Sequence, residues 1–244
     1  MYKLILRALI IAACAMFLGA CVSAPKQQAY NRELNSSIKQ IHILPMPNEK
    51  LQLFIFNNPG YNFGIIGALV AEGNRTAKQT WVRNAGVTAN FDYLTTFRGT
   101  FDAAMRERGY ELIWPASLVE SKDSVKRDAF GYRKKYASVS DADAQLDLAL
   151  QFVGYAAAGP GDGQPYRPTV NLSVRLLSAD GKQVLYADTV RYHNVASDQQ
   201  AIILEPDPDY AYPDFDDLKK AGPVAIDGLK LAVEACATAL AKQL

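Results

Sequence analysis

Hydrophobic and polar positions alternate through much of the second half of the chain, and this pattern predicts three consecutive β-strands. The alternation runs through "QLDLALQFVGY" (145–155), "TVNLSVRLL" (169–177) and "QVLYADTVRYH" (183–193). A period of two places one face of each strand on a core and leaves the other face polar. Asp180-Gly181, between the second and third segments, is a strong hairpin signal. We therefore expect an antiparallel meander.

Two other segments repeat hydrophobic residues every three or four positions, which predicts amphipathic helices. The central helix is marked by Phe91, Leu94, Phe101 and Met105, and Gly109 is placed to end it. The stripe of the C-terminal helix consists of Ile226, Leu229, Val233, Cys236 and Leu240. Because Cys236 lies in this stripe, we expect it to be a small core residue rather than a reactive thiol.

Short β-branched or aromatic segments supply the remaining elements. Residues 38–44 and 51–56 are predicted strands, as is "YELIW" (110–114). The charged stretch 117–137 is expected to be helical in part, with the basic residues from Lys122 to Lys135 on a solvent-exposed helix. The order of elements predicts one α+β domain over 37–244, a two-layer sandwich. Its C-terminal meander would be covered by the long C-terminal helix and the central helix.

The N-terminal residues have the layout of a secretory signal peptide. Lys3 and Arg7 supply positive charge, and the thirteen residues Ala8–Ala20 are small or apolar. A run of that length is too short to cross a hydrocarbon core of roughly 30 Å. We therefore expect residues 1–20 to be a signal peptide.

The end of this segment, Leu18-Gly19-Ala20-Cys21, resembles the lipobox of bacterial lipoproteins. The resemblance implies cleavage before Cys21, acyl chains on that residue, and firm anchoring in a membrane. Residues 21–36 would then be the lipidated N-terminus and a flexible polar tether. Val22 stands where an aspartate favours the inner membrane in related lipoproteins. We expect an outer-membrane lipoprotein whose domain faces the periplasm.

A glycine-punctuated apolar run, "GYNFGIIGALVAEG" (60–73), has three possible roles. Its glycine spacing fits neither a phosphate-binding loop nor a dinucleotide fingerprint. If the run is helical, its small residues fall on neighbouring lines; they are Gly60, Gly64, Gly67, Ala68 and Ala71. Small residues at four-residue spacing let a second backbone approach closely. Packing within the fold, contact with another chain, and shallow membrane insertion all remain open.

The segment "EPDPDYAYPDFDD" (205–217) combines six carboxylates with Tyr210, Tyr212 and Phe215. It lacks the glycine and the terminal glutamate of a calcium-binding loop. Three interpretations are open: a solvated connection to the last helix, a loop whose aromatic residues bind a partner, and a cation site.

The composition gives little sign of catalysis. A formal net charge of +1 does not favour nucleic-acid binding. His42 and His193 are the only histidines, and neither stands in a metal-ligand spacing, so we expect no metal and no cofactor. No nucleophile motif of the G-x-S-x-G type occurs. We therefore expect a protein that is not an enzyme.

The body of the chain is similar to periplasmic lipoproteins with the α/β fold of the curli-secretion channel protein and the peptidoglycan-synthase activators. The similarity lies in "RERGYELI" (106–113) and "LLSADGKQVLYA" (176–187). It implies a binding or assembly module rather than a catalyst. We expect the protein to dock onto an envelope complex through residues 60–73 or the acidic loop. The alternatives are a subunit of a homo-oligomeric envelope ring and an envelope enzyme acting on glycan or lipid.

Overall fold

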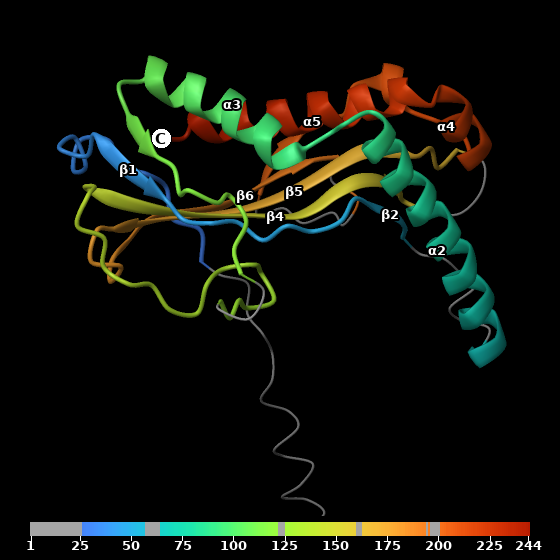
Figure 1. Ribbon diagram of the computed structural model, residues 1–244, viewed down its shortest axis with the longest axis horizontal. Coiled ribbons are helices and arrows are strands. Elements are labelled where there is room, and N and C mark those ends of the chain that lie inside the picture. Colours follow the sequence, from blue (N-terminus) through green and yellow to red (C-terminus); the bar gives the residue numbers. More distant parts are fainter. Residues whose placement is uncertain (1–25, 57–63, 122–124, 160–162, 194, 196–200) are drawn as a thin grey trace, which may run out of the picture.

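The computed structural model describes residues 26–56, 64–121, 125–159, 163–193, 195 and 201–244. These residues form a layer of helices over one mixed sheet, whose strands follow the order β3-β1-β4-β5-β6-β7, with β2 also paired to β4 (Figure 1). The strands are β1 (Gln40–Ile43), β2 (Gln52–Ile55), β3 (Glu111–Ile113), β4 (Ala144–Ala157), β5 (Arg167–Ser178), β6 (Val184–Tyr192) and β7 (Ile202–Leu204). The helices are α2 (Gly64–Thr88), α3 (Tyr93–Glu107), α4 (Phe215–Ala221) and α5 (Pro223–Ala241), with a short 3-10 helix, η2 (Pro208–Tyr210).

The predicted meander is confirmed. β4 pairs with β5 and β5 pairs with β6, both in antiparallel register. In the turn between β5 and β6, Gly181 adopts a φ of 73°, which a residue without Cβ tolerates well. The Asp180 carboxylate accepts a hydrogen bond from the Lys182 amide at 3.1 Å and so fixes this turn.

The free edge of β4 is occupied by two short strands in succession. β1 pairs in parallel with its first residues, and β2 pairs in parallel with its last. The second pairing depends on Gly154, because a Cβ at this position would overlap the carbonyl oxygen of Gln52. The sheet is therefore mixed rather than a simple meander.

The helical layer confirms the predicted two-layer α+β sandwich. α5 lies along β4, β5 and β6, and α3 runs beside α5 (Figure 1). Asp92 caps α3 by accepting hydrogen bonds from the amides of Leu94 and Thr95. Cys236 is fully buried in α5, as expected for a core residue, and burial raises the pKa of its thiol.

The predicted helix within residues 117–137 is wrong. The described part of this segment consists of turns and isolated bridges, including one between Arg127 and Arg133. It lies on the side of the sheet opposite α3 and α5 (Figure 1). The charged residues do not form a solvated helix face because both arginines turn inward to the buried carboxylate of Asp147.

α2 is longer than the apolar run within which it begins. It leaves the body obliquely, and its N-terminal half extends beyond the sheet (Figure 1). Contacts with the body come from its C-terminal half. Val82 is fully buried, the Trp81 ring packs edge-on to Phe215, and Lys78 donates a hydrogen bond to the Tyr166 hydroxyl at 2.8 Å. These contacts fix the C-terminal half of α2 to the body.

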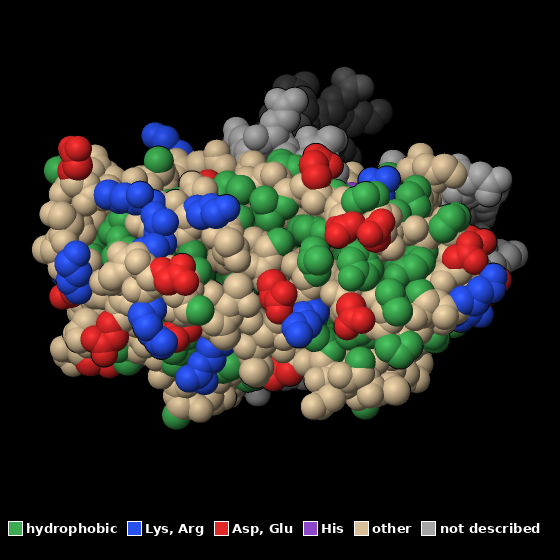
Figure 2. Space-filling view, turned by 90° about the horizontal axis from the view of Figure 1, so that it is seen from above, with side chains coloured by type: hydrophobic (Ala, Val, Ile, Leu, Met, Phe, Trp, Pro, Cys, Tyr) green, Lys and Arg blue, Asp and Glu red, His purple; other side chains and the backbone are tan. Residues whose placement is uncertain are grey.

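The outer face of the helical layer carries both signs of charge. Figure 2 shows acidic and basic side chains interspersed, with hydrophobic side chains gathered toward the end that holds α4. Val224, at the start of α5, is 53% exposed. In the part of the chain that the structure describes, none of the helices combines the length and the apolarity that a membrane span requires.

Candidate functional site

The residues predicted to contact a membrane or another chain fall into two groups. Cys21 and Gly60 lie outside the described residues. Gly64, Gly67, Ala68 and Ala71 belong to the N-terminal half of α2, the half that extends past the sheet (Figure 1). Their assignment as a contact surface stays a prediction. The helical backbone does put Gly64, Ala68 and Ala71 at three- and four-residue intervals along one helix, as the small-residue pattern requires.

The acidic segment is organised by its own carboxylates. Asp207 caps η2, and Asp214 caps α4. The three aromatic residues pack toward the body: Tyr212 is only 9% exposed, the Tyr210 ring lies against Gly228, and Phe215 contacts Trp81. The proposed role of these rings in partner binding stays a prediction, but they do not form a fully exposed aromatic surface.

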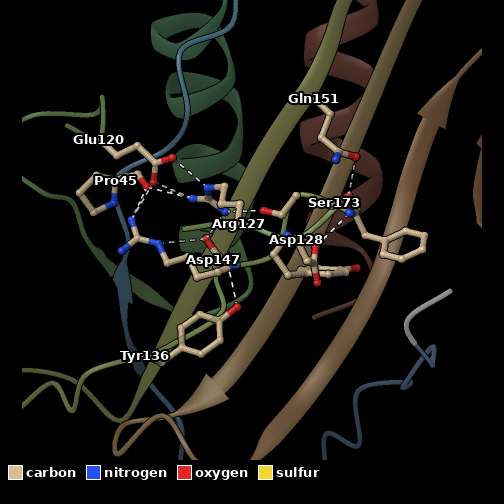
Figure 3. A network of polar contacts seen from close by, with 12 residues as sticks. Pro45, Glu120, Arg127, Asp128, Tyr136, Asp147, Gln151 and Ser173 are labelled. Atoms are coloured by element: carbon tan, nitrogen blue, oxygen red, sulfur yellow. Dashed lines mark hydrogen bonds and ion pairs between the residues drawn. The ribbon is translucent and has the colours of Figure 1, made fainter. Parts of the chain in front are cut away.

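A network of ion pairs lies between β4 and the segment that covers it (Figure 3). At its centre is Asp147, whose side chain is 1% exposed. Its carboxylate accepts a hydrogen bond from Arg127 Nη1 at 3.0 Å, and the same guanidinium donates to both oxygens of Glu120 at 2.9 Å. A bidentate pair of this kind fixes the guanidinium and the Glu120 carboxylate in one geometry.

Arg133 and Tyr136 complete the network. Arg133 lies 3.2 Å from Glu120 and 3.5 Å from Asp147, and the Tyr136 hydroxyl donates to Asp147 at 2.9 Å. Burial alone would lower the pKa of Arg127, but the hydrogen bonds and negative charges of its two carboxylate partners outweigh it and raise that pKa. Two cations thus face two anions, and the network acts as a clamp that holds the covering segment to the sheet.

A cavity of about 670 Å³ lies beside this clamp, between the β1–β2 connection and α2. Arg75, Gln79 and Arg83 line it from α2, at four-residue intervals that place them on one helix face. Lys50 and Gln52 line it from the opposite side, and Glu120 forms part of its wall. The lining is therefore mostly polar and rich in cations.

A second cavity, of about 570 Å³, adjoins the first and shares Asn48, Lys50 and Arg83 with it. Its other walls include Leu51, Phe91 and Tyr93. Leu51 and Tyr93 are buried, so this cavity reaches an edge of the hydrophobic core. Lys50 and Arg83 stand where a polar space meets a more apolar one.

The two histidines lie apart. His42 is on β1 and approaches Asp141 at 3.1 Å. His193 follows β6, and its Nδ1 lies 2.9 Å from the Thr169 hydroxyl. Two strands, β4 and β5, separate β1 from β6 in the sheet. Within the described residues, no group of three or more His, Cys, Asp and Glu side chains is arranged to hold a metal ion.

His193 predicts a loss of stability in mild acid. Burial, helped by the charge of Arg167, lowers its pKa from 6.5 to about 4. Below pH 6.5 the unfolded chain binds a proton here while the native ring stays neutral until about pH 4, so the free energy of unfolding falls as the pH falls through this window. After a discount for partial solvent exposure, we expect a loss of ~1–2 kcal/mol.

Urea unfolding of the wild-type protein and of His193→Asn at pH 7 and pH 4.5 measures this loss. Asparagine tolerates the φ of 64° at this position. The carboxylates titrate equally in both proteins. The informative quantity is therefore the difference between the pH dependence of the wild type and that of His193→Asn. Equal pH dependence in the two proteins would show that His193 does not titrate with a lowered pKa.

The sequence did not point to the cavities or to the clamp. Asp147 carried the clearest signal, since an acidic residue interrupts an apolar strand pattern a short distance after two arginines. Lys50 and Arg83 carried none, because they lie in different elements and meet only when α2 packs beside β2.

Comparisons with known proteins identify no family. No protein-family model matches the chain, and no curated protein matches it. Among solved structures, the chain is weakly similar to protein XCC0632 from Xanthomonas campestris, of the family DUF330. The two share 10% sequence identity over 82% of this chain and 90% of that one, with a TM-score of 0.26. A TM-score this low supports no argument about fold or function.

Proposed function

We propose that the protein is a lipid-anchored binding module of the bacterial cell envelope, attached to the outer membrane through Cys21 and facing the periplasm. In this proposal it is not an enzyme, and it docks onto a membrane-embedded protein of an envelope complex through the N-terminal half of α2. The observation that carries the proposal is the extension of that half-helix beyond the body (Figure 1).

The position of the chain's first described segment favours this contact. Gln28 bridges to Ala187 on β6, and the described chain begins on the side of the sheet opposite α3 and α5 (Figure 1). The N-terminal end of α2 extends toward the same side. Lys26 stands five residues after Cys21, a span of at most about 18 Å. A lipid at Cys21 would therefore hold the end of α2 near the membrane surface.

The sequence of this half-helix suits contact with another protein. The apolar run from Phe63 to Ala71 is nine residues long and, as a helix, spans only about 14 Å. That length does not cross a bilayer. Its small residues instead permit close approach of a second backbone. A membrane-embedded partner would cover this surface and account for its apolar character.

Site-specific crosslinking in intact cells tests the proposal. A photoreactive phenylalanine analogue at Ala71 should crosslink to one recurrent partner protein, identified by mass spectrometry. The same analogue at Lys230, an exposed position on α5, should not capture it. The Cys21→Ala variant should leave the membrane fraction and lose the crosslink, because the anchor no longer holds α2 near its partner.

The outcomes separate the alternatives. Crosslinks between two copies of this chain at Ala71 would favour the homo-oligomeric ring and contradict docking onto a different protein. Unchanged membrane retention of Cys21→Ala, with no mass difference of lipid size, would exclude the anchor. A partner captured equally from Lys230 would show that α2 does not define the contact.

A further inference from the structure

Arg83, which stands between the two cavities, carries a positive charge that no described carboxylate balances. Its Nε donates to the backbone carbonyl of Leu51 at 3.1 Å, and its Nη2 lies 3.4 Å from the side-chain oxygen of Gln79. Both partners are neutral, and the guanidinium is partly buried. A charge withdrawn from water without a counter-ion is unfavourable, and a bound anion would relieve that cost.

A second cation and a third line the same space. Lys50 makes no hydrogen bond or ion pair with any described residue, and it borders both cavities together with Arg83. Arg75 lines the first cavity two turns earlier on the same face of α2. The side-chain amides of Gln52 and Gln79 also line the first cavity, and each already donates a hydrogen bond to a backbone carbonyl.

The carboxylates in the walls are largely engaged elsewhere. Glu120 is bound by Arg127 and Arg133 of the clamp, and Asp92 accepts hydrogen bonds from the first turn of α3. Glu49, on the exposed loop before β2, is the remaining carboxylate among the lining residues. The positive charges of Lys50 and Arg83 therefore face space large enough for a ligand, since each cavity is within the range of roughly 300–1,000 Å³ usual for binding pockets.

We propose that the paired cavities bind a phosphate-bearing ligand whose phosphate group lies between Lys50 and Arg83. A guanidinium supplies parallel N–H donors that match phosphate oxygens, and the ammonium group adds a point charge. The phosphate could belong to a soluble phosphate ester or to a phospholipid headgroup. In the second case Leu51, Phe91 and Tyr93 would receive the start of an acyl chain. This proposal rests on the cavities and is independent of docking through α2.

Isothermal titration calorimetry on the full-length protein in non-ionic detergent tests the site with two probes, sn-glycerol 3-phosphate and dihexanoyl phosphatidic acid. We expect saturable binding of at least one probe. Lys50→Glu and Arg83→Gln should each weaken it about tenfold or more, as loss of a charge-assisted hydrogen bond implies. The control Lys230→Glu makes the same charge change on α5, outside both cavities, and should leave affinity within about twofold.

The two probes identify the source of the phosphate. Clearly tighter binding of dihexanoyl phosphatidic acid would indicate a phospholipid, and equal binding would indicate a soluble ester. Lys50 is exposed, so Lys50→Glu remains informative even if Arg83→Gln fails to fold. Absence of saturable binding with both probes would overturn the proposal, as would binding that Lys50→Glu leaves unchanged or that Lys230→Glu weakens equally.

Discussion

Replacing Asp147 with asparagine is expected to lower the free energy of unfolding by about 3–5 kcal/mol, because it removes one partner of a buried ion network. Arg127 and Arg133 would then face a single carboxylate, Glu120, in a space from which water is largely excluded. Urea unfolding at pH 7, followed by far-ultraviolet circular dichroism, measures the change. The covering segment should also become sensitive to proteolysis, because the clamp is what attaches it to β4.

Asp141→Asn is the matched control for this variant. It makes the same chemical change at a carboxylate that is 53% exposed and, among the described residues, is paired with His42 alone. Exposed pairs of this kind contribute ~0–1 kcal/mol. If the two variants lost similar stability, the buried network would not be the main attachment of the covering segment.

Replacing Gly154 with alanine is expected to cost more than about 3 kcal/mol or to prevent folding, because the new methyl group would overlap backbone that has no room to move. The overlap is with the carbonyl oxygen of Gln52, and neighbouring backbone atoms of the same residue are also too close. β2 would have to separate from β4. The fraction of soluble protein and the urea midpoint together measure the effect.

Gly99→Ala provides the opposite case. Gly99 lies on α3, where an added Cβ would meet nothing within 4 Å. Replacing glycine with alanine inside a helix is expected to stabilise it by ~1 kcal/mol. If Gly154→Ala proved as stable as wild type, the parallel pairing of β2 with β4 would be wrong, because a Cβ at residue 154 and this strand pairing cannot coexist in the same register.

The strands and helices that the sequence predicts well are those with one buried face. Leu148, Leu150 and Leu172 alternate with mostly polar neighbours because one side of the meander faces α5, and the stripe of α5 is its complement. Such a pattern can be read within one segment and does not depend on how the rest of the chain is arranged. The turn at Asp180-Gly181 is local in the same sense.

The segment that covers the far face of the sheet could not be predicted in this way. Its charges resemble a solvated helix when read along the chain, and only the position of Asp147 in space makes them buried. α2 was missed for a different reason. Glycines at 64, 67, 73 and 86 weaken the helical signal, and its apolar run ends long before the helix does.

The cavities were beyond local pattern altogether. Lys50 belongs to a loop and Arg83 to a helix, and their proximity follows from the Leu51 carbonyl that binds the arginine. A site built from single side chains on separate elements produces no periodic pattern in the sequence.

The parallel edge of β4 also bears on the order in which the structure can form. Gln40, at the start of β1, hydrogen-bonds Asp143, which lies 103 residues later in the chain. β2 pairs with the end of β4, whose residues lie a similar distance later in the chain. The paired strands of the meander, in contrast, are consecutive in the sequence. A chain that emerges N-terminus first therefore carries β2 without its strand partner until β4 is available, while β1 has only the short β3 to pair with before then. The late closure of such distant pairs is what makes a topology slow to fold.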